Sequence, residues 1–272
     1  MRAVSLHRDV IVATSRIYAT NCTIVRGPRG EAEEASNETF VVDSPILPDE
    51  LELLPSIVSQ AGFAEPVGLL ATHVDWDHVL GPLAFPGAPL GCAESSAARL
   101  SAEPGAAQRE LRAFDDELYV SRPRPLSLSS VQALPVPGRL GIGSEELELH
   151  PAEGHTADGM AIVIGWAGVL LAGDYASATE IPTLAGSVDA YLATLERLAP
   201  LVAACEHVVP GHGPPLARAE AERVLEEDAA YIVELRERGA RASLPPRRRS
   251  GAQRRLHERN AAALERGVSP RS

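Results

Sequence analysis

The stretch Thr72-His73-Val74-Asp75-Trp76-Asp77-His78 places four side chains of the types that bind metal ions within six positions. Before it runs Pro66-Val67-Gly68-Leu69-Leu70-Ala71, a short apolar segment that predicts a buried strand. After it comes Val79-Leu80-Gly81-Pro82, which indicates a turn. Imidazoles and carboxylates are rarely buried without partners, so we expect a loop at the end of a core strand, where a rigid scaffold positions functional groups. A solvated acidic turn that contains two histidines is the alternative interpretation.

Alternating and β-branched runs predict strands, and segments that begin with Pro or acidic residues and end at Gly predict helices. The expected strands cover 10–13, 22–25, 39–42, 66–71, 89–92, 147–150, 161–166, 169–172 and 207–209. The expected helices cover 48–61, 93–100, 106–118, 188–198 and 216–238. A stretch rich in Pro, Ser and Gly predicts a long connecting loop over 122–143.

The composition limits the location of the protein. The chain has 272 residues, 45% of them hydrophobic, which suffices for a substantial core. No apolar run reaches the roughly 18 to 20 residues that cross a bilayer, and the N-terminal residues do not form a secretory signal. Cys22, Cys92 and Cys205 are odd in number and far apart, which predicts neither a disulfide framework nor a CxxC metal site. We therefore expect a cytoplasmic protein with no membrane partner.

The net charge of −12 is unevenly distributed along the chain. All 25 basic residues are arginine, and eleven of them lie at or after Arg236, where the only acidic residues are three glutamates. The remainder of the chain is strongly acidic, which argues against nucleic acid as a partner. Without lysine, the chain cannot form a Schiff base or supply a P-loop lysine.

These features divide the chain into a body, residues 1–243, and an Arg-rich tail, residues 244–272. High charge and few large apolar residues predict weak order for the tail. The tail is interpreted either as a solvated segment or as an arm for an acidic partner, such as the body of a second subunit. A homo-oligomer therefore stays open.

Three more residues of ligand type stand beside predicted strands, each with a glycine neighbour: His155 in Glu153-Gly154-His155-Thr156, Asp174 in Ala172-Gly173-Asp174 and His212 in Val209-Pro210-Gly211-His212-Gly213. Glycine permits close approach of the backbone and leaves a cleft open. Each of these residues alone is more typical of a turn. Together with the first stretch, they predict a metal site.

In chain order, Asp43, His73-x-Asp75-x-Asp77-His78, His155, Asp174 and His212 resemble the pattern of the metallo-β-lactamase fold superfamily over about residues 10–215. The resemblance, which is to the glyoxalase II-like and lactonase-like single-domain branch, implies an α+β fold, a four-layer αββα sandwich with metals at one edge between two sheets. It implies that His73, Asp75 and His155 hold one metal and that Asp77, His78 and His212 hold a second. Asp174 would bridge the two metals.

Asp75 departs from the family, which usually has histidine at this position. Two histidines and a carboxylate suit iron or manganese as well as zinc. We therefore expect one or two Zn2+ ions, with Fe or Mn as alternatives. Because Asp is shorter than His, a weak or absent first metal is the other interpretation of this substitution.

The metal chemistry and the resemblance together predict a hydrolase that uses a metal-bound hydroxide on a small ester-like substrate, such as a thioester or a lactone. The resemblance implies that Asp77 orients the nucleophile and that Asp43 supports the metal loop through hydrogen bonds. Tyr175 is a candidate oxyanion donor, with ordinary packing as its alternative. Trp76 either lines the substrate cleft or caps the core. Two other functions stay open: an iron-dependent dioxygenase of the persulfide type on the same fold, and a non-catalytic relative that binds a metal or a ligand.

Overall fold

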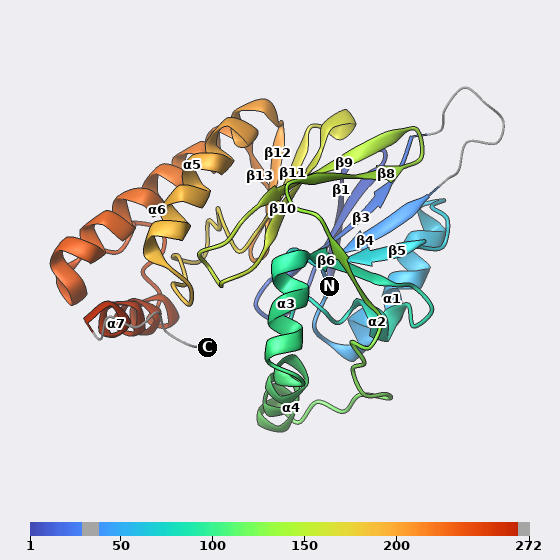
Figure 1. Ribbon diagram of the computed structural model, residues 1–272, viewed down its shortest axis with the longest axis horizontal. Helices are drawn as coiled ribbons and strands as arrows, with labels where there is room; N and C mark the ends of the chain where they lie inside the picture. Colours follow the sequence, from blue (N-terminus) through green and yellow to red (C-terminus); the bar gives the residue numbers. More distant parts are fainter. Residues whose placement is uncertain (29–37, 266–272) are drawn as a thin grey trace.

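A computed structural model describes residues 1–28 and 38–265, which form four layers (Figure 1). Two sheets lie face to face in the middle, and helices cover the outer face of each sheet. The predicted α+β class and its four-layer αββα arrangement are thereby confirmed.

The first sheet contains seven strands in chain order, from β1 to β7. The strands from β1 to β4 pair antiparallel, and those from β4 to β7 pair parallel. They are β1 (Arg2–His7), β2 (Val10–Thr14), β3 (Asn21–Arg26), β4 (Thr39–Val42), β5 (Gly68–Leu70), β6 (Leu90–Ala93) and β7 (Val131–Leu134).

The second sheet contains six strands in the order β13-β12-β11-β10-β9-β8. Only the β11–β12 pair in this sheet is parallel among the described residues. The strands are β8 (Gly138–Ile142), β9 (Glu145–Pro151), β10 (Met160–Ile164), β11 (Val169–Gly173), β12 (His207–Pro210) and β13 (Leu216–Ala217).

The helices fall into two groups, one for each sheet (Figure 1). The first sheet is covered by α1 (Pro48–Gln60), α2 (Gly81–Ala84), α3 (Glu94–Ala102) and α4 (Ala106–Leu118). The second sheet is covered by α5 (Val188–Ala204), α6 (Arg218–Arg238) and α7 (Gly251–Glu265). The short 3-10 helix η1 (Gly165–Ala167) joins β10 to β11, and η2 (Gly239–Arg241) follows α6. None of the described helices combines the length and the apolar composition that a membrane span requires.

Strand β11 shows why the sequence folds into layers. Its five residues are all buried, because the strand has apolar neighbours on both faces. Leu170 and Ala172 face the core beneath α5 and α6, whereas Val169 and Leu171 face the core between the sheets. A continuous apolar run, rather than an alternating one, is the pattern expected of such a strand.

The strands β4, β5, β11 and β12 carry the site, because each ends at the same edge of the sandwich. The parallel pairs β4–β5 and β11–β12 bring the carboxyl ends of neighbouring strands together within each sheet. Asn21 then joins the two sheets at this edge: its side-chain amide donates to the carbonyl oxygens of Pro210 at 2.8 Å and Gly213 at 2.7 Å.

Residues 122–143, expected to form a connecting loop, contain β7 and β8 instead. Each is the edge strand of its sheet, and β7 is largely exposed. Edge strands tolerate Pro and Gly because half of their backbone groups need no partner, so their composition resembles that of a loop. Strand β1 also lies outside the expected strands.

The segment 244–265 differs from the weak order expected of the tail. It contains α7, and Leu256 and Ala261 are buried in the same core as α5 and α6. Its charges do not all face water: Arg248 is 1% exposed and pairs with Asp228. Residues 266–272 of the predicted tail lie outside the described residues.

We predict that side chains in the core between the sheets contribute strongly to the stability of the fold. The Ile162→Ala substitution removes a fully buried side chain of β10 and should lower the free energy of unfolding by about 2 to 5 kcal/mol. Leu53→Ala in α1, where the side chain is 51% exposed, should change it by about 0.5 kcal/mol or less. Urea unfolding followed by circular dichroism measures both, and equal losses in the two variants would contradict the assignment of this core.

Candidate metal centre

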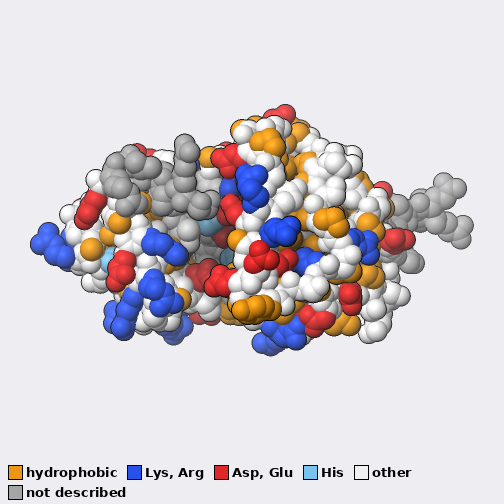
Figure 2. All heavy atoms as spheres, turned by 90° about the horizontal axis from the view of Figure 1, so that it is seen from below, with side chains coloured by type: hydrophobic (Ala, Val, Ile, Leu, Met, Phe, Trp, Pro, Cys, Tyr) orange, Lys and Arg blue, Asp and Glu red, His pale blue; other side chains and the backbone are white. Residues whose placement is uncertain are grey.

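The seven predicted ligands converge at the edge of the sandwich where the site strands end. Four come from the loop after β5, one from the loop between β9 and β10, and one each from the loops after β11 and β12. They form three overlapping groups whose ligand atoms lie within 4.8 Å of one another: His73, Asp75 and His155; His73, His78 and Asp174; and Asp77, His78 and His212. On the face shown in Figure 2, histidine side chains appear with acidic side chains beside them.

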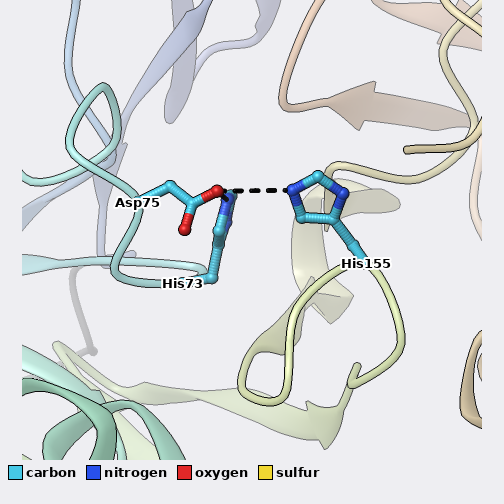
Figure 3. A group of neighbouring side chains, drawn as sticks. All are labelled: His73, Asp75 and His155. Carbon is cyan, nitrogen blue, oxygen red and sulfur yellow. Dashed lines mark ion pairs between the residues drawn. The ribbon is translucent and has the colours of Figure 1, made fainter. Parts of the chain in front are cut away.

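The first group is His73, Asp75 and His155 (Figure 3). Oδ2 of Asp75 lies 3.7 Å from Nε2 of His73 and 3.5 Å from Nε2 of His155. Figure 3 shows the two rings pointing toward this carboxylate from different segments of the chain. Asp75 therefore reaches the same point in space as both histidines, despite being shorter than the histidine of the family pattern.

The second group is Asp77, His78 and His212. Oδ2 of Asp77 lies 3.8 Å from Nε2 of His78 and 3.4 Å from Nε2 of His212. The Nε2 atoms of these two histidines are 3.4 Å apart. Three potential ligand atoms thus face one point.

Asp174 lies between the two groups. Its Oδ2 is 3.3 Å from Nε2 of both His155 and His212, and its Oδ1 is 3.3 Å from Nε2 of His78. The carboxylate therefore faces both candidate metal positions, which is where a bridging ligand would stand.

Buried atoms without hydrogen bonds show that these residues fit a metal ion. Nε2 of His73, Nε2 of His155 and Oδ1 of Asp174 are buried and make no hydrogen bond within the described part of the chain. A buried polar atom without such a partner is unfavourable, and atoms of this kind are rare in folded proteins. Imidazole nitrogens and carboxylate oxygens are ligands for divalent zinc, iron and manganese, so a cation at this place satisfies all three.

The charges of the site shift the pKa values of its side chains in the direction opposite to that of burial. Burial lowers the pKa of His212, but the carboxylates of Asp174 and Asp77 outweigh it and raise that pKa to about 10. At His78 and His155, too, neighbouring carboxylates outweigh the effect of burial and raise the pKa of the imidazole. Burial alone would raise the pKa of Asp174, yet the surrounding imidazoles hold it well below its usual range. The same side chains therefore hold together as ion pairs when protonated, and a metal that binds them displaces protons.

The outer nitrogens of two histidines face carbonyl oxygens. Nδ1 of His155 lies 3.2 Å from the carbonyl oxygen of Thr183, and Nδ1 of His212 lies 3.0 Å from that of Tyr18. A carbonyl oxygen only accepts, so each Nδ1 must carry the proton for the bond to form. In the neutral rings the Nε2 lone pairs are then directed at the site, as in histidines that bind metals.

Asp43 fixes His78 and the loop that carries it. Its Oδ1 accepts from the backbone N–H of Thr72 at 2.7 Å, its Oδ2 accepts from the Thr72 hydroxyl at 2.8 Å, and Oδ2 also lies 3.1 Å from Nδ1 of His78. Asp43 has a φ of +57°, a left-handed conformation that non-glycine residues seldom adopt and that concentrates at functional sites. The backbone is thus held in an unfavourable conformation that aims this carboxylate at the metal loop.

Arg99 completes the first group, and sequence reasoning missed it. Its Nη1 lies 2.7 Å from Oδ1 of Asp75 and 2.8 Å from Oδ1 of the buried Asp158. Asp158 is itself held by the hydroxyls of Ser96 at 2.7 Å and Thr156 at 2.8 Å. One oxygen of Asp75 is therefore fixed by Arg99 while the other faces the two histidines. The signal in the sequence is indirect: a carboxylate in place of a histidine adds a buried charge, which needs a cation nearby.

The structure does not place Tyr175 for the predicted role as an oxyanion donor. The side chain is 2% exposed, and its hydroxyl donates to the carbonyl oxygen of Ala152 at 3.2 Å and accepts from the backbone N–H of His155 at 2.9 Å. Burial raises the pKa of this hydroxyl. Tyr175 therefore supports the backbone of His155 and does not face a substrate.

Comparisons with known proteins place the chain in a family. The family model described as the metallo-beta-lactamase superfamily matches residues 19–212. Among solved structures, the metallo-beta-lactamase family protein TTHA1429 from Thermus thermophilus is similar at 20% identity, with a TM-score of 0.66, over 97% of this chain and 95% of that chain. The stereoselective inverting sec-alkylsulfatase Pisa1 from Pseudomonas sp. is similar at 13% identity, with a TM-score of 0.69, over 98% of this chain and 50% of that chain.

A third structure, TTHA1623 in a di-iron-bound form, is similar at 22% identity, with a TM-score of 0.54, over 78% of this chain and 97% of that chain. At these identities the likeness shows the fold. No curated protein matches the sequence.

We predict that the close approach of Gly211 to Asp174 is required for metal binding. A Cβ at Gly211 would collide with Oδ1 of Asp174 and press on the ring of His78. Gly211→Ala should therefore displace both ligands and lose most of the bound metal. Gly141→Ala, where a Cβ has no neighbour within 4 Å, is the matched control and should keep the metal. Elemental analysis of both purified variants measures this, and full occupancy in Gly211→Ala would rule out the close approach.

We also predict that the charge of Asp43 strengthens metal binding. Asparagine tolerates the same left-handed backbone but lacks the charge that faces His78. Asp43→Asn should weaken metal affinity by about 10- to 100-fold, the effect usual for partners of metal-binding histidines. Asp49→Asn, on an exposed carboxylate paired with Arg16, should leave affinity unchanged. Competition with a metallochromic chelator gives both affinities, and equal values would show that the Asp43 charge has no part in binding.

Proposed function

The chain belongs to the metallo-beta-lactamase superfamily, and from this premise we propose that it is a metal-dependent hydrolase of a small ester-like substrate, such as a thioester or a lactone. The observation that carries the proposal is the convergence of four imidazoles and three carboxylates, with Asp174 facing two of the three-residue groups. Such an arrangement suits two divalent ions that share one carboxylate.

We propose zinc as the metal, with iron or manganese as alternatives at the first group. His73, Asp75 and His155 would hold one ion, Asp77, His78 and His212 the other, and Asp174 both. When bound, such ions lower the pKa of a coordinated water from about 15.7 to roughly 7 and polarise the oxygen of a carbonyl or phosphoryl group. TTHA1623, which shares the fold, has been solved with two irons.

Asp77 is the residue that we assign to proton handling. Its side chain is 12% exposed, and its carboxylate lies beside His78 and His212. A carboxylate here can accept a hydrogen bond from the attacking water, fix its direction, and pass its proton to the leaving group.

An aromatic cluster beside the site supports a substrate with an apolar part. Trp76, between the ligands Asp75 and Asp77, lies 4.7 Å from the ring of Phe114 and 6.4 Å from that of Tyr18, measured between centroids. Tyr18 is 53% exposed. Trp76 thus packs against the core and also contacts an exposed ring, and we propose that it lines the substrate cleft as well. These rings offer a surface for the acyl or alkyl group of an ester.

A second candidate function, an iron-dependent dioxygenase of the persulfide type, is favoured by one observation. His73, Asp75 and His155 are two histidines and one carboxylate that face one point, the ligand set of many non-haem Fe(II) oxygenases. Oxygen uptake by the iron-loaded protein with a persulfide tests it, and no uptake would exclude it.

We propose a small molecule, rather than nucleic acid, as the partner, because residues before the C-terminal arginines are strongly acidic. The cytoplasmic location, the absence of a membrane partner and a homo-oligomer stay predictions from the sequence.

The hydrolase proposal predicts the behaviour of Asp77→Asn. The amide keeps the size of the side chain but cannot accept a proton, so turnover of an activated thioester or lactone should fall by about 100-fold or more. His78, His212 and Asp174 remain as ligands of the same ion, so metal content, measured by elemental analysis after metal loading, should stay near that of the wild type. Asp116→Asn, at an exposed position of α4, is the control and should retain full turnover. Wild-type turnover in a metal-loaded Asp77→Asn would remove Asp77 from the mechanism.

A further inference from the structure

A loop without helix or strand, residues 177–186, contacts the backbone of two candidate ligands and the ring of one of them; we call it the site loop. The Ser177 hydroxyl donates to the carbonyl oxygen of His212 at 2.8 Å. The carbonyl oxygen of Thr183 faces Nδ1 of His155 at 3.2 Å, and the backbone N–H of Ala185 donates to the carbonyl oxygen of His155 at 3.0 Å. The conformation of the site loop therefore bears on the direction of the His155 ring and on the backbone position of His212.

The site loop is held in turn by Arg248, which follows α6 in the chain and precedes α7. Its Nη1 donates to the carbonyl oxygens of Glu180 at 2.9 Å and Ser177 at 3.2 Å, and also bonds Oδ1 of Asp228. Its Nη2 donates to Oε2 of Glu227 at 3.1 Å. The planar guanidinium, with five N–H donors in a fixed geometry, is the one side chain that makes this set of bonds at once.

Helix α7 adds further bonds to the same loop. Oε1 of Gln253 accepts from the backbone N–H of Ile181 at 2.7 Å. The amide of Asn260 donates to the carbonyl oxygen of Pro182 at 2.8 Å, and its oxygen accepts from the backbone N–H of Leu184 at 3.4 Å. Several polar backbone groups of the site loop are thus satisfied by the C-terminal segment, and not by a neighbouring strand.

The buried pair also lies close to the ligands. Asp228 lines the same narrow cavity as Asp174, His155 and His212. Arg248 is among the largest fully buried side chains of the described residues. A buried ion pair adds little net stability, because desolvation of both charges opposes their attraction. What the pair supplies here is a fixed geometry behind the site loop.

We propose that Arg248 is a positioning residue of the metal centre. It fixes the site loop through the carbonyl groups of Ser177 and Glu180, and through the loop it fixes His155 and His212. The C-terminal segment is then part of the support of the metal site. This inference rests on the proposed metal-dependent function.

The test compares full-length Arg248→Met with Arg247→Met. Methionine keeps much of the apolar stem of arginine and removes the guanidinium. The neighbouring Arg247 is a matched control, because its side chain is 69% exposed and its ion pair is with Glu220 at the surface. Each protein is loaded with Co2+, its visible absorption spectrum is recorded, and metal release to excess chelator is followed by stopped flow.

We expect Arg248→Met to release metal about 10-fold faster or more, the range found for supports of metal-binding residues, with a changed cobalt spectrum. Arg247→Met should match the wild type in both. Val58→Ala, in the core beneath α1, controls for a general loss of stability and should leave the cobalt spectrum and the release rate unchanged.

Arg248→Met leaves Asp228 buried without its partner, so its fold is checked by circular dichroism. Asn260→Ala, which removes uncharged contacts with the site loop and with Tyr231, is measured in parallel and should also speed release, by a smaller factor. The inference would be overturned if a folded Arg248→Met had the release rate and the cobalt spectrum of the wild type. If Arg248→Met does not fold, the same result in Asn260→Ala would overturn it. A wild-type protein that binds no metal would overturn the proposed function as well, so the two failures are distinguishable.

Discussion

The Asp174 carboxylate holds the site together, because its two oxygens lie within 3.9 Å of the Nε2 atoms of four imidazoles. Those four rings come from segments as far apart in the chain as His73 and His212, so they meet only if two sheets are packed face to face with their strand ends aligned. The apolar core between the sheets and the bonds from Asn21 across the edge provide that alignment. Gly211 adds a local requirement, since any side chain there would occupy the place of the carboxylate.

Asp75 shows how the site accommodates a residue that is unusual for the family. A third carboxylate adds negative charge to a buried cluster, and Arg99 compensates it, while Asp158, itself bonded by Ser96, holds the guanidinium in turn. The hydrogen bonds and charges of His155 and His73 outweigh burial and hold the pKa of Asp75 well below its usual range. The carboxylate is therefore ionised and aimed, which is the state in which it can bind a cation.

Much of this could be predicted from the sequence, because an apolar run that ends in several ligand-type side chains is uncommon away from a functional site. The stretch from Thr72 to His78 and the glycine-flanked His155, Asp174 and His212 belong to that kind of signal. The edge strands β7 and β8 could not be recognised, because exposed edges place little demand on composition. The roles of Arg99 and Arg248 could not be predicted either. An arginine in a helix or in a charged tail is typical of a solvated charge, and only the three-dimensional contacts show that Arg99 pairs with the buried Asp158 and Arg248 with the buried Asp228.

The most direct test of a two-metal centre is the metal content of protein purified without added metal, compared between the wild type and Asp75→His. We expect about two divalent ions per chain in the wild type, because Asp75 already faces the two histidines of the first group, and no increase in Asp75→His. One ion in the wild type that rises to two in Asp75→His would show that Asp75 does not act as a ligand. No metal in either protein, even after reconstitution with zinc, iron or manganese, would contradict the assignment of a metal centre.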